Sequence, residues 1–262
     1  MTYVETDLTA TISDLAGADL HDLTQAQIDG IDQFHSGGAE AVDRLIPGLG
    51  LKPGMTVLDV GSGLGGPARQ IARSAGCDVV GVDITRAYVE AATSLTSVAG
   101  LTDRVQFVET DIATLERTNF DAAYTMHVQM NVADKPAFFT EIGRRLRPGA
   151  HLAVFEVCRA GRRDPALPLP WSIDGSDNFL ATPADLRSNI ESGGFTAVEW
   201  VDETAWILQW FDELGARLAD ADTAATLPAL LTDGYARMLN FAAALADGIL
   251  TVHRGAFRLV GR

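Results

Sequence analysis

Cysteine is scarce in this 262-residue chain, which contains only Cys77 and Cys158. Two distant cysteines form neither a disulfide framework nor a spaced metal motif, so we expect no metal site and a reducing environment. No apolar run reaches the length of a membrane span. The acids Glu5, Asp7 and Asp14 stand where a secretory signal needs positive charge. We therefore expect a cytoplasmic protein with no membrane partner.

Basic residues are also few, because 20 Lys and Arg stand against 35 Asp and Glu, for a net charge of -15. Nucleic acids and anionic lipid surfaces are bound through clusters of Lys and Arg. The charge balance therefore argues against a nucleic-acid partner and against an anionic membrane surface. The oligomeric state cannot be read from the sequence.

Apolar runs of strand length alternate with amphipathic segments of helix length through the middle of the chain, which is typical of a parallel sheet wrapped by helices. The length fits one large domain, or one domain with a sizeable appendage. The predicted strands are 56–60, 78–82, 105–108, 120–124, 151–157 and 197–201, and the predicted helices are 67–75, 86–99, 135–146 and 183–192.

Two regions fall outside this alternation and have helical spacing of their own. Residues 1–50 are predicted to form a helical lid segment, and residues 203–247 a helical cap inserted into the 51–202 core. Residues 248–262 are predicted to return to the sheet, either as a hairpin or as one long last strand. Pro148 and Gly149 are expected to end the preceding helix.

The segment Asp59-Val60-Gly61-Ser62-Gly63-Leu64-Gly65-Gly66 follows the first apolar strand and precedes a helix. Its glycines let the backbone turn tightly and approach a ligand. The glycines alone also satisfy a dinucleotide-binding pattern. Asp59 favours another ligand, because its carboxylate would repel a pyrophosphate at the helix N-terminus and would suit an ammonium group.

With the later blocks Val80-Gly81-Val82-Asp83, Thr110-Asp111-Ile112 and Arg144-Arg145-Leu146-Arg147-Pro148-Gly149, the chain resembles the class I S-adenosylmethionine-dependent methyltransferases. The resemblance covers roughly residues 50–262. It implies a Rossmann-like α/β fold with a mostly parallel seven-stranded sheet, helices on both faces and a helical cap. It also implies that S-adenosylmethionine is bound and S-adenosylhomocysteine released.

The resemblance implies roles for two acids that follow neighbouring strands. Asp83 would accept hydrogen bonds from both ribose hydroxyls of the cofactor. Asp111 would accept from the adenine amino group, with Ile112 packed on the ring. Each acid could instead cap the helical segment that follows it.

Two further blocks, 32–38 and 126–135, resemble a bacterial small-molecule branch that includes sarcosine and dimethylglycine N-methyltransferases. They suggest His35 and His127 as catalytic candidates, although either histidine could be structural. The predicted cofactor-binding residues are Gln33, Asp59, Gly61, Gly63, Gly65, Asp83, Ile84, Asp111, Ile112 and Met126. The predicted substrate-contacting residues are Phe34, Met130, Trp171, Trp206 and Tyr235, of which the aromatic residues could instead be core.

These patterns predict a methyltransferase that acts on a small molecule, with N-methylation of an amine or heterocycle favoured over O- or C-methylation of a secondary metabolite. In a reaction of this kind the positioning of the acceptor supplies most of the rate enhancement. A non-catalytic nucleotide-binding module is the alternative from another class. An apolar cavity beside the cofactor would favour the enzyme.

Overall fold

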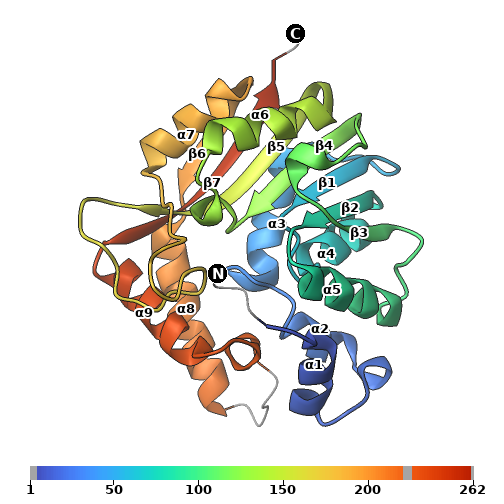
Figure 1. Cartoon of the computed structure of the whole chain (residues 1–262), viewed down its shortest axis with the longest axis vertical. Coiled ribbons are helices and arrows are strands. Elements are labelled where there is room, and N and C mark those ends of the chain that lie inside the picture. Colours follow the sequence, from blue (N-terminus) through green and yellow to red (C-terminus); the bar gives the residue numbers. More distant parts are fainter. Residues whose placement is uncertain (1–4, 221–225, 261–262) are drawn as a thin grey trace.

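The structure is a computed structural model that describes residues 5–220 and 226–260 (Figure 1). One sheet has the strand order β3-β2-β1-β4-β5-β7-β6. Only β7 runs antiparallel to its neighbours, β5 and β6. The strands are β1 Thr56–Val60, β2 Asp78–Asp83, β3 Val105–Glu109, β4 Phe120–Met126, β5 Leu146–Arg159, β6 Phe195–Asp202 and β7 Leu250–Leu259. The predicted mostly parallel, seven-stranded sheet is confirmed.

Strand β1 lies inside the sheet, paired in parallel with β2 on one side and β4 on the other. This position explains its nearly unbroken apolar sequence, because both faces of such a strand are covered. The chain leaves β1 toward β2 and later returns to place β4 on the other side of β1. The loops after β1 and β4 therefore diverge, which opens a crevice at the carboxyl ends of these strands.

Helices cover both faces of the sheet. Buried side chains of α3 (Gly38–Leu49) and α4 (Gly66–Ala75) pack on one face. Those of α6 (Lys135–Arg145) and α7 (Pro183–Ser192) pack on the other. Helix α5 (Arg86–Val98) packs beside β2 and β3. In the described part of the chain, none of the helices combines the length and apolar character needed to cross a membrane.

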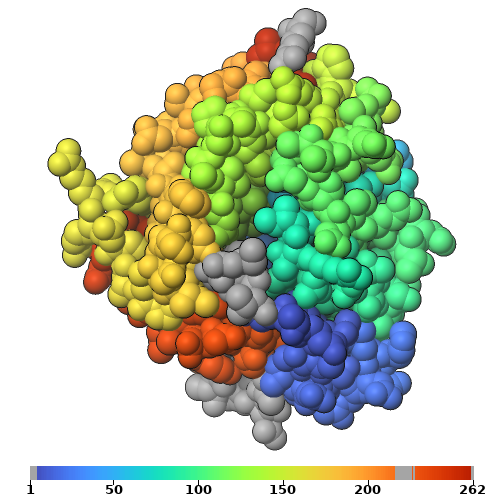
Figure 2. Space-filling view, viewed as in Figure 1, coloured from blue at the N-terminus to red at the C-terminus, as the bar shows by residue number. Residues whose placement is uncertain are grey.

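Two helical segments lie below the sheet in Figure 1. The N-terminal one contains α1 (Leu8–Ala16), the 3-10 turn η1 (Leu20–Asp22) and α2 (Gln25–Asp29). The other contains α8 (Thr204–Asp220), η4 (Leu227–Leu230) and α9 (Gly234–Ala246), between β6 and β7. Figure 2 shows the two segments meeting on one face. They are also joined by an ion pair, in which Arg237 Nη1 lies 3.8 Å from Glu5 Oε1.

The end of the chain forms one strand, β7, so the single-strand alternative is correct. Register pairs run without interruption from His151↔Arg258 to Arg159↔Leu250. The helix predicted over residues 135–146 ends at Arg145, one residue earlier, and Leu146 already belongs to β5. Pro148 and Gly149 therefore lie inside β5. They stand where the pairing of β5 with β4 shifts register, between Phe120 and Ala122 of β4.

A buried ion pair joins the N-terminal segment to the helix that follows the glycine loop. Arg69 Nη2 lies 2.8 Å from Asp32 Oδ2, and both side chains are almost fully buried. The same nitrogen donates to the Leu64 carbonyl at 2.7 Å, and Nη1 donates to Thr96 Oγ1. Burial raises the pKa of Asp32 to about 6, against the opposing charge of Arg69. The N-terminal segment is thereby attached to the loop that approaches the ligand.

Replacing Arg69 with Met should lower the free energy of unfolding by about 3–5 kcal/mol, because the Asp32 carboxylate would stay buried without its partner. Urea denaturation followed by circular dichroism measures this loss. Arg73→Met is the matched control on the exposed side of the same helix, and it should change stability by less than about 0.5 kcal/mol. Equal losses in the two variants would contradict the importance of the buried pair.

Candidate active site

The glycine loop between β1 and α4 requires glycine for two reasons. Gly61 and Gly65 have positive φ values of 79° and 78°. A Cβ atom at Gly61 would lie 2.4 Å from a methyl group of Val128, and one at Gly65 would lie 2.3 Å from the ring of Phe107. Over Gly63 the space is open, since a Cβ atom there would meet only Phe34, at 3.8 Å. The loop thus packs closely against Val128 and Phe107 and leaves open space at Gly63.

Asp83 ends β2 and faces the glycine loop. Its Oδ2 accepts a hydrogen bond from the Gly63 N–H at 3.0 Å, and its Oδ1 accepts one from the Thr85 N–H at 2.9 Å. Both oxygens keep a second lone pair, so the carboxylate can still accept from a pair of hydroxyls. Desolvation raises the pKa of Asp83 above its usual value, although these two N–H groups oppose the rise. The Asp83 carboxylate can therefore anchor the glycine loop and bind a ligand at the same time.

Asp111 and two isoleucines border the neighbouring part of the site. Asp111 Oδ1 accepts from the Ala113 N–H at 2.8 Å and caps the 3-10 turn η2 (Ile112–Thr114). Ile112 is buried, whereas Ile84 is 73% exposed. An exposed isoleucine next to a hollow provides an apolar surface for a planar ring. The capping role and the predicted adenine contact can coexist at Asp111.

These elements surround a cavity of about 550 Å³, a size typical of cofactor and substrate pockets. Most of its exposed lining is contributed by apolar atoms. The predicted residues that line it are Phe34, Gly61, Gly63, Asp83, Ile84, Asp111, Ile112, Met126 and His127. The open space over the glycine loop, the Asp83 carboxylate and the two isoleucines fit a nucleoside that carries an aliphatic tail.

His127 follows β4 and lines the cavity in an unusual backbone conformation. Its φ of 55° is left-handed, which costs a non-glycine residue about 1–3 kcal/mol and is often retained at functional sites. Its ring stacks on Phe155, with centroids 5.8 Å apart. Nε2 lies 3.2 Å from Ser36 Oγ. The ring is thus held between β5 and the N-terminal segment.

His35 lies beside His127, with ring centroids 6.2 Å apart, but does not line the cavity. Its Nδ1 donates to the Ser36 carbonyl at 3.1 Å, since a carbonyl only accepts. Its Nε2 lies 2.8 Å from Gln33 Oε1, while the Gln33 amide nitrogen donates to Gln70 Oε1 at 3.4 Å. Gln33 and His35 are therefore bonded to each other beneath the cavity wall.

Both histidines are neutral at pH 7. Burial lowers the pKa of His35 to about 4, against the hydrogen bond to Ser36. Burial, together with the neighbouring His35, holds the pKa of His127 well below its usual range. A neutral imidazole at the cavity wall can accept a proton or a hydrogen bond.

Asp59 is buried under the glycine loop and does not line the cavity. It is 2% exposed and stands opposite Tyr124 in the β1–β4 register. Burial raises the pKa of Asp59 to about 7, and the Tyr124 hydroxyl opposes that rise. Oδ2 has no hydrogen-bond partner among the described residues. Its predicted contact with an ammonium group stays a prediction.

The remaining predicted residues also lie outside the cavity. Trp206 packs against Gly37, where a Cβ atom would lie 2.6 Å from the indole, and it carries the Arg44 guanidinium 4.0 Å above its ring. Tyr235 is 58% exposed, because α9 turns Arg237 and Phe241 inward instead. The full set outside the cavity is Gln33, His35, Asp59, Gly65, Met130, Trp171, Trp206 and Tyr235. Direct substrate contact by Met130, Trp171, Trp206 and Tyr235 stays a prediction.

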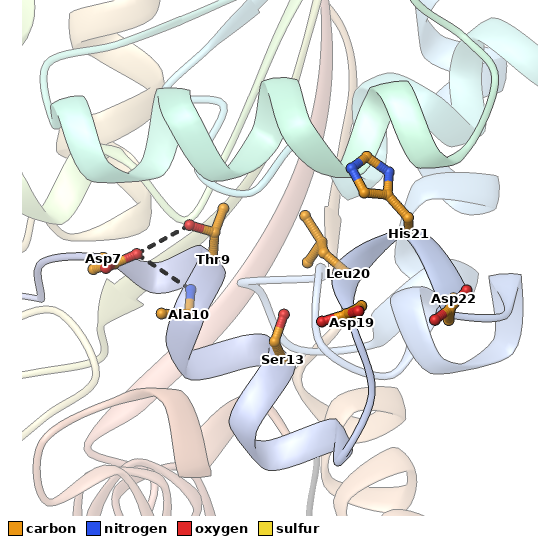
Figure 3. Close-up of a pocket in the computed structure, with 8 residues that line it drawn as sticks. All are labelled: Asp7, Thr9, Ala10, Ser13, Asp19, Leu20, His21 and Asp22. Atoms are coloured by element: carbon orange, nitrogen blue, oxygen red, sulfur yellow. Dashed lines mark hydrogen bonds between the residues drawn. The ribbon is translucent and has the colours of Figure 1, made fainter.

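A second hollow lies on the N-terminal segment, among α1 and η1 (Figure 3). Asp7 accepts there from the Thr9 hydroxyl and the Ala10 N–H, so its carboxylate caps the helix. No residue that we predicted for the site lines this hollow. The crevice at the strand ends is therefore the candidate active site.

Residues 51–201 match the methyltransferase domain family, which is more than half of the chain. The chain belongs to this family. This membership confirms the predicted resemblance to S-adenosylmethionine-dependent methyltransferases. The assignment agrees with the placement of Asp83 and the glycine loop around one cavity.

Among curated methyltransferases, a sterol 24-C-methyltransferase of Yarrowia lipolytica is 36% identical over 122 residues, 46% of this chain and 32% of that protein. The matches to the first three such relatives span 29% to 51% of their lengths.

Solved structures share the fold of this methyltransferase-family chain. Geranyl diphosphate C-methyltransferase from Streptomyces coelicolor has a TM-score of 0.71 at 18% identity, covering 98% of this chain and all of that one. Haemonchus contortus phosphoethanolamine N-methyltransferase 2 has a TM-score of 0.70 at 19% identity, covering 97% and 57%. At such identities the likeness concerns the fold alone.

Glu156 and Tyr88 belong to this site but were not predicted from the sequence. Glu156 is a fully buried acid in β5 whose carboxylate bonds to the loop after β4. Its signal was a single charge inside the apolar run Ala153-Val154-Phe155-Glu156-Val157. Tyr88 lines the cavity and packs edge-on against Phe34, with centroids 5.3 Å apart. An aromatic residue on an amphipathic helix carries no comparable signal.

Acid should destabilise the native chain more than a His35→Asn variant. The unfolded His35 takes up a proton near pH 6.5, whereas the folded one resists protonation until about pH 4. The stability contributed by neutral His35 is therefore lost as pH falls through this window, by up to about 3 kcal/mol. The difference between the two chains reports the loss of His35 together with its effect on the neighbouring His127, because the buried acids Asp32 and Asp59 are present in both.

Urea unfolding of both chains at half-unit steps from pH 7.5 to 4.5 measures that difference. A constant difference across the range would contradict the burial of a neutral His35.

Proposed function

We propose that this chain is an S-adenosylmethionine-dependent methyltransferase that acts on a small molecule. The observation that carries the proposal is the cavity in which the glycine loop, the Asp83 carboxylate and the two isoleucines line one side and His127 lines another. Asp83 would bind the ribose hydroxyls, and Ile84 and Ile112 would hold the adenine, next to Asp111. The aliphatic end would then extend over Gly61 and Gly63 toward His127.

The bound cofactor supplies an electrophilic methyl group on a sulfonium. The protein must hold the acceptor in line with that methyl group and keep water away, and this positioning accounts for most of the rate enhancement. Phe34, Met126 and Val128 line the cavity with apolar surface. His127, neutral at pH 7, would accept a hydrogen bond or a proton from the acceptor.

An amine or heterocyclic nitrogen is our proposed acceptor. The supporting observations are the resemblance of residues 32–38 and 126–135 to sarcosine and dimethylglycine N-methyltransferases, and the neutral His127 that the second block carries. A nitrogen nucleophile must lose its proton to react, and a neutral imidazole at the cavity wall provides a place for it. The acidic character of the chain also favours basic ligands over anionic ones.

Carbon is the second candidate acceptor. It is favoured by the 36% identity of the core to a sterol 24-C-methyltransferase and by the apolar lining of the cavity. C-methylation of an alkene also ends with loss of a proton, so it would use His127 in the same way. O-methylation stays an alternative that no specific observation favours.

Replacing Asp83 with Ala should weaken S-adenosylmethionine binding by about 100-fold or more, because two hydrogen bonds to a charged acceptor are lost. Isothermal titration calorimetry measures the change. Asp78→Ala, at the exposed opposite end of β2, is the matched control and should bind like the native chain. Absence of binding by the native chain, or equal binding by both variants, would refute the cofactor site.

A panel of amines, heterocycles, phenols and alkenes, with S-adenosylhomocysteine release as the readout, tests the acceptor. We expect turnover with amines or heterocycles, and a rate about 100-fold lower in His127→Asn, which loses the proton acceptor. Asparagine is chosen because it tolerates the left-handed backbone. His151→Asn is the control, because His151 lies in β5 and its Nδ1 bonds to the Gly48 carbonyl of α3.

If only alkenes are turned over, carbon replaces nitrogen as the proposed acceptor. Cofactor binding without turnover of any acceptor class would favour the non-catalytic module.

A further inference from the structure

The loop that carries His127 is attached to β5 through three consecutive residues. The Phe155 carbonyl accepts from the His127 N–H at 2.8 Å. Glu156 Oε2 accepts from the N–H groups of Val128 at 2.9 Å and Gln129 at 3.2 Å. The Val157 carbonyl accepts from the Gln129 side chain. The carboxylate is the one side chain in this set that bonds to two backbone groups of the loop.

Glu156 itself is held from the opposite side. Its Oε1 accepts from Thr125 Oγ1 at 2.5 Å, and Thr125 precedes the last residue of β4. The side chain is 0% exposed. A buried carboxylate is costly unless several donors surround it. Three donors, from β4 and from the loop that follows it, meet this requirement. The hydrogen bonds of the Glu156 carboxylate therefore all lie within this turn of the backbone.

The strained residue lies inside this hydrogen-bonded turn. His127 keeps a left-handed φ of 55°, and such a conformation persists only where its surroundings impose it. The hydrogen bonds that the Phe155 carbonyl and the Glu156 carboxylate accept from residues 127–129 are the contacts that impose it.

 Val128, the next residue, packs against the glycine loop at Gly61. The glycine loop itself is held separately, by the bond from the Gly63 N–H to Asp83.

We propose that Glu156 is the positioning residue of this site: its carboxylate holds the loop after β4 so that the His127 imidazole stays at the cavity wall. This inference rests on the proposed methyl transfer only for its effect on rate. The placement of the His127 ring can be tested without any acceptor.

The test compares four chains, the native one, Glu156→Leu, Glu156→Gln and Asp121→Leu. Leucine removes both acceptor oxygens. Glutamine keeps one oxygen for the two N–H groups and can donate to Thr125 Oγ1. Asp121 is the matched control, because its carboxylate also accepts a backbone N–H, from Thr56 at 2.8 Å, but at the opposite end of β4.

The first readout is the pH titration of the His127 ring by NMR, assigned with His127→Asn. In Glu156→Leu the freed loop should let the ring reach water, so its pKa should rise by about one unit or more toward the ordinary value. Glutamine should restore most of the native behaviour, and Asp121→Leu should leave the titration unchanged although it destabilises the fold. An unchanged titration in Glu156→Leu, or the same change in Asp121→Leu, would overturn the proposal.

The second readout is calorimetry with S-adenosylhomocysteine, for which Glu156→Leu should change the dissociation constant by less than about 3-fold, because Asp83 and its loop stay in place. With an acceptor from the panel, kcat should fall by about 100-fold in Glu156→Leu and far less in Glu156→Gln. If Glu156→Leu does not fold, Thr125→Val replaces it and should shift the His127 titration in the same direction. No shift there would also overturn the proposal.

The two proposals fail in different ways. If the native chain binds no cofactor, the proposed function fails, while the His127 titration still decides the role of Glu156. If the native chain transfers methyl groups and Glu156→Leu does so at the native rate, the positioning role fails and the function stands.

Discussion

Carboxylates at the carboxyl ends of the strands are the constraint on which this site depends. Asp83 accepts from the glycine loop and from the start of the next helical segment. Glu156 accepts from the loop after β4. In both cases a carboxylate that is costly to bury is stabilised by backbone N–H groups, and those groups belong to the loops that form the cavity walls. The sheet thereby fixes loops that have no regular structure of their own.

The N-terminal segment completes the same cavity from outside the sheet. Asp32 and Arg69 join it to the glycine loop, and Ser36 bonds to His127. Phe34, between these two anchors, lines the cavity. A segment that lies far from β4 in the sequence therefore supports both the cofactor side and the His127 side of the site.

Much of this arrangement could be predicted from the sequence. The apolar run before Gly61 indicated a strand covered on both faces, and acids after two successive strands indicated carboxylates at one sheet edge. Local patterns did not show which face of a helix turns inward. In α9, apolar residues occur on all sides, and the buried Arg237, which donates to the Leu169 carbonyl, turns Tyr235 outward. Glu156 could not be assigned because its partners lie about 30 residues away in the sequence.

The cavity between Asp83 and His127 is where we expect the cofactor to bind, and a crystal structure with S-adenosylhomocysteine is the decisive measurement. We expect the ribose hydroxyls on Asp83, the adenine between Ile84 and Ile112, and the sulfur facing His127. A ligand bound elsewhere, or in this cavity with its adenine toward His127, would show that the site is assigned wrongly.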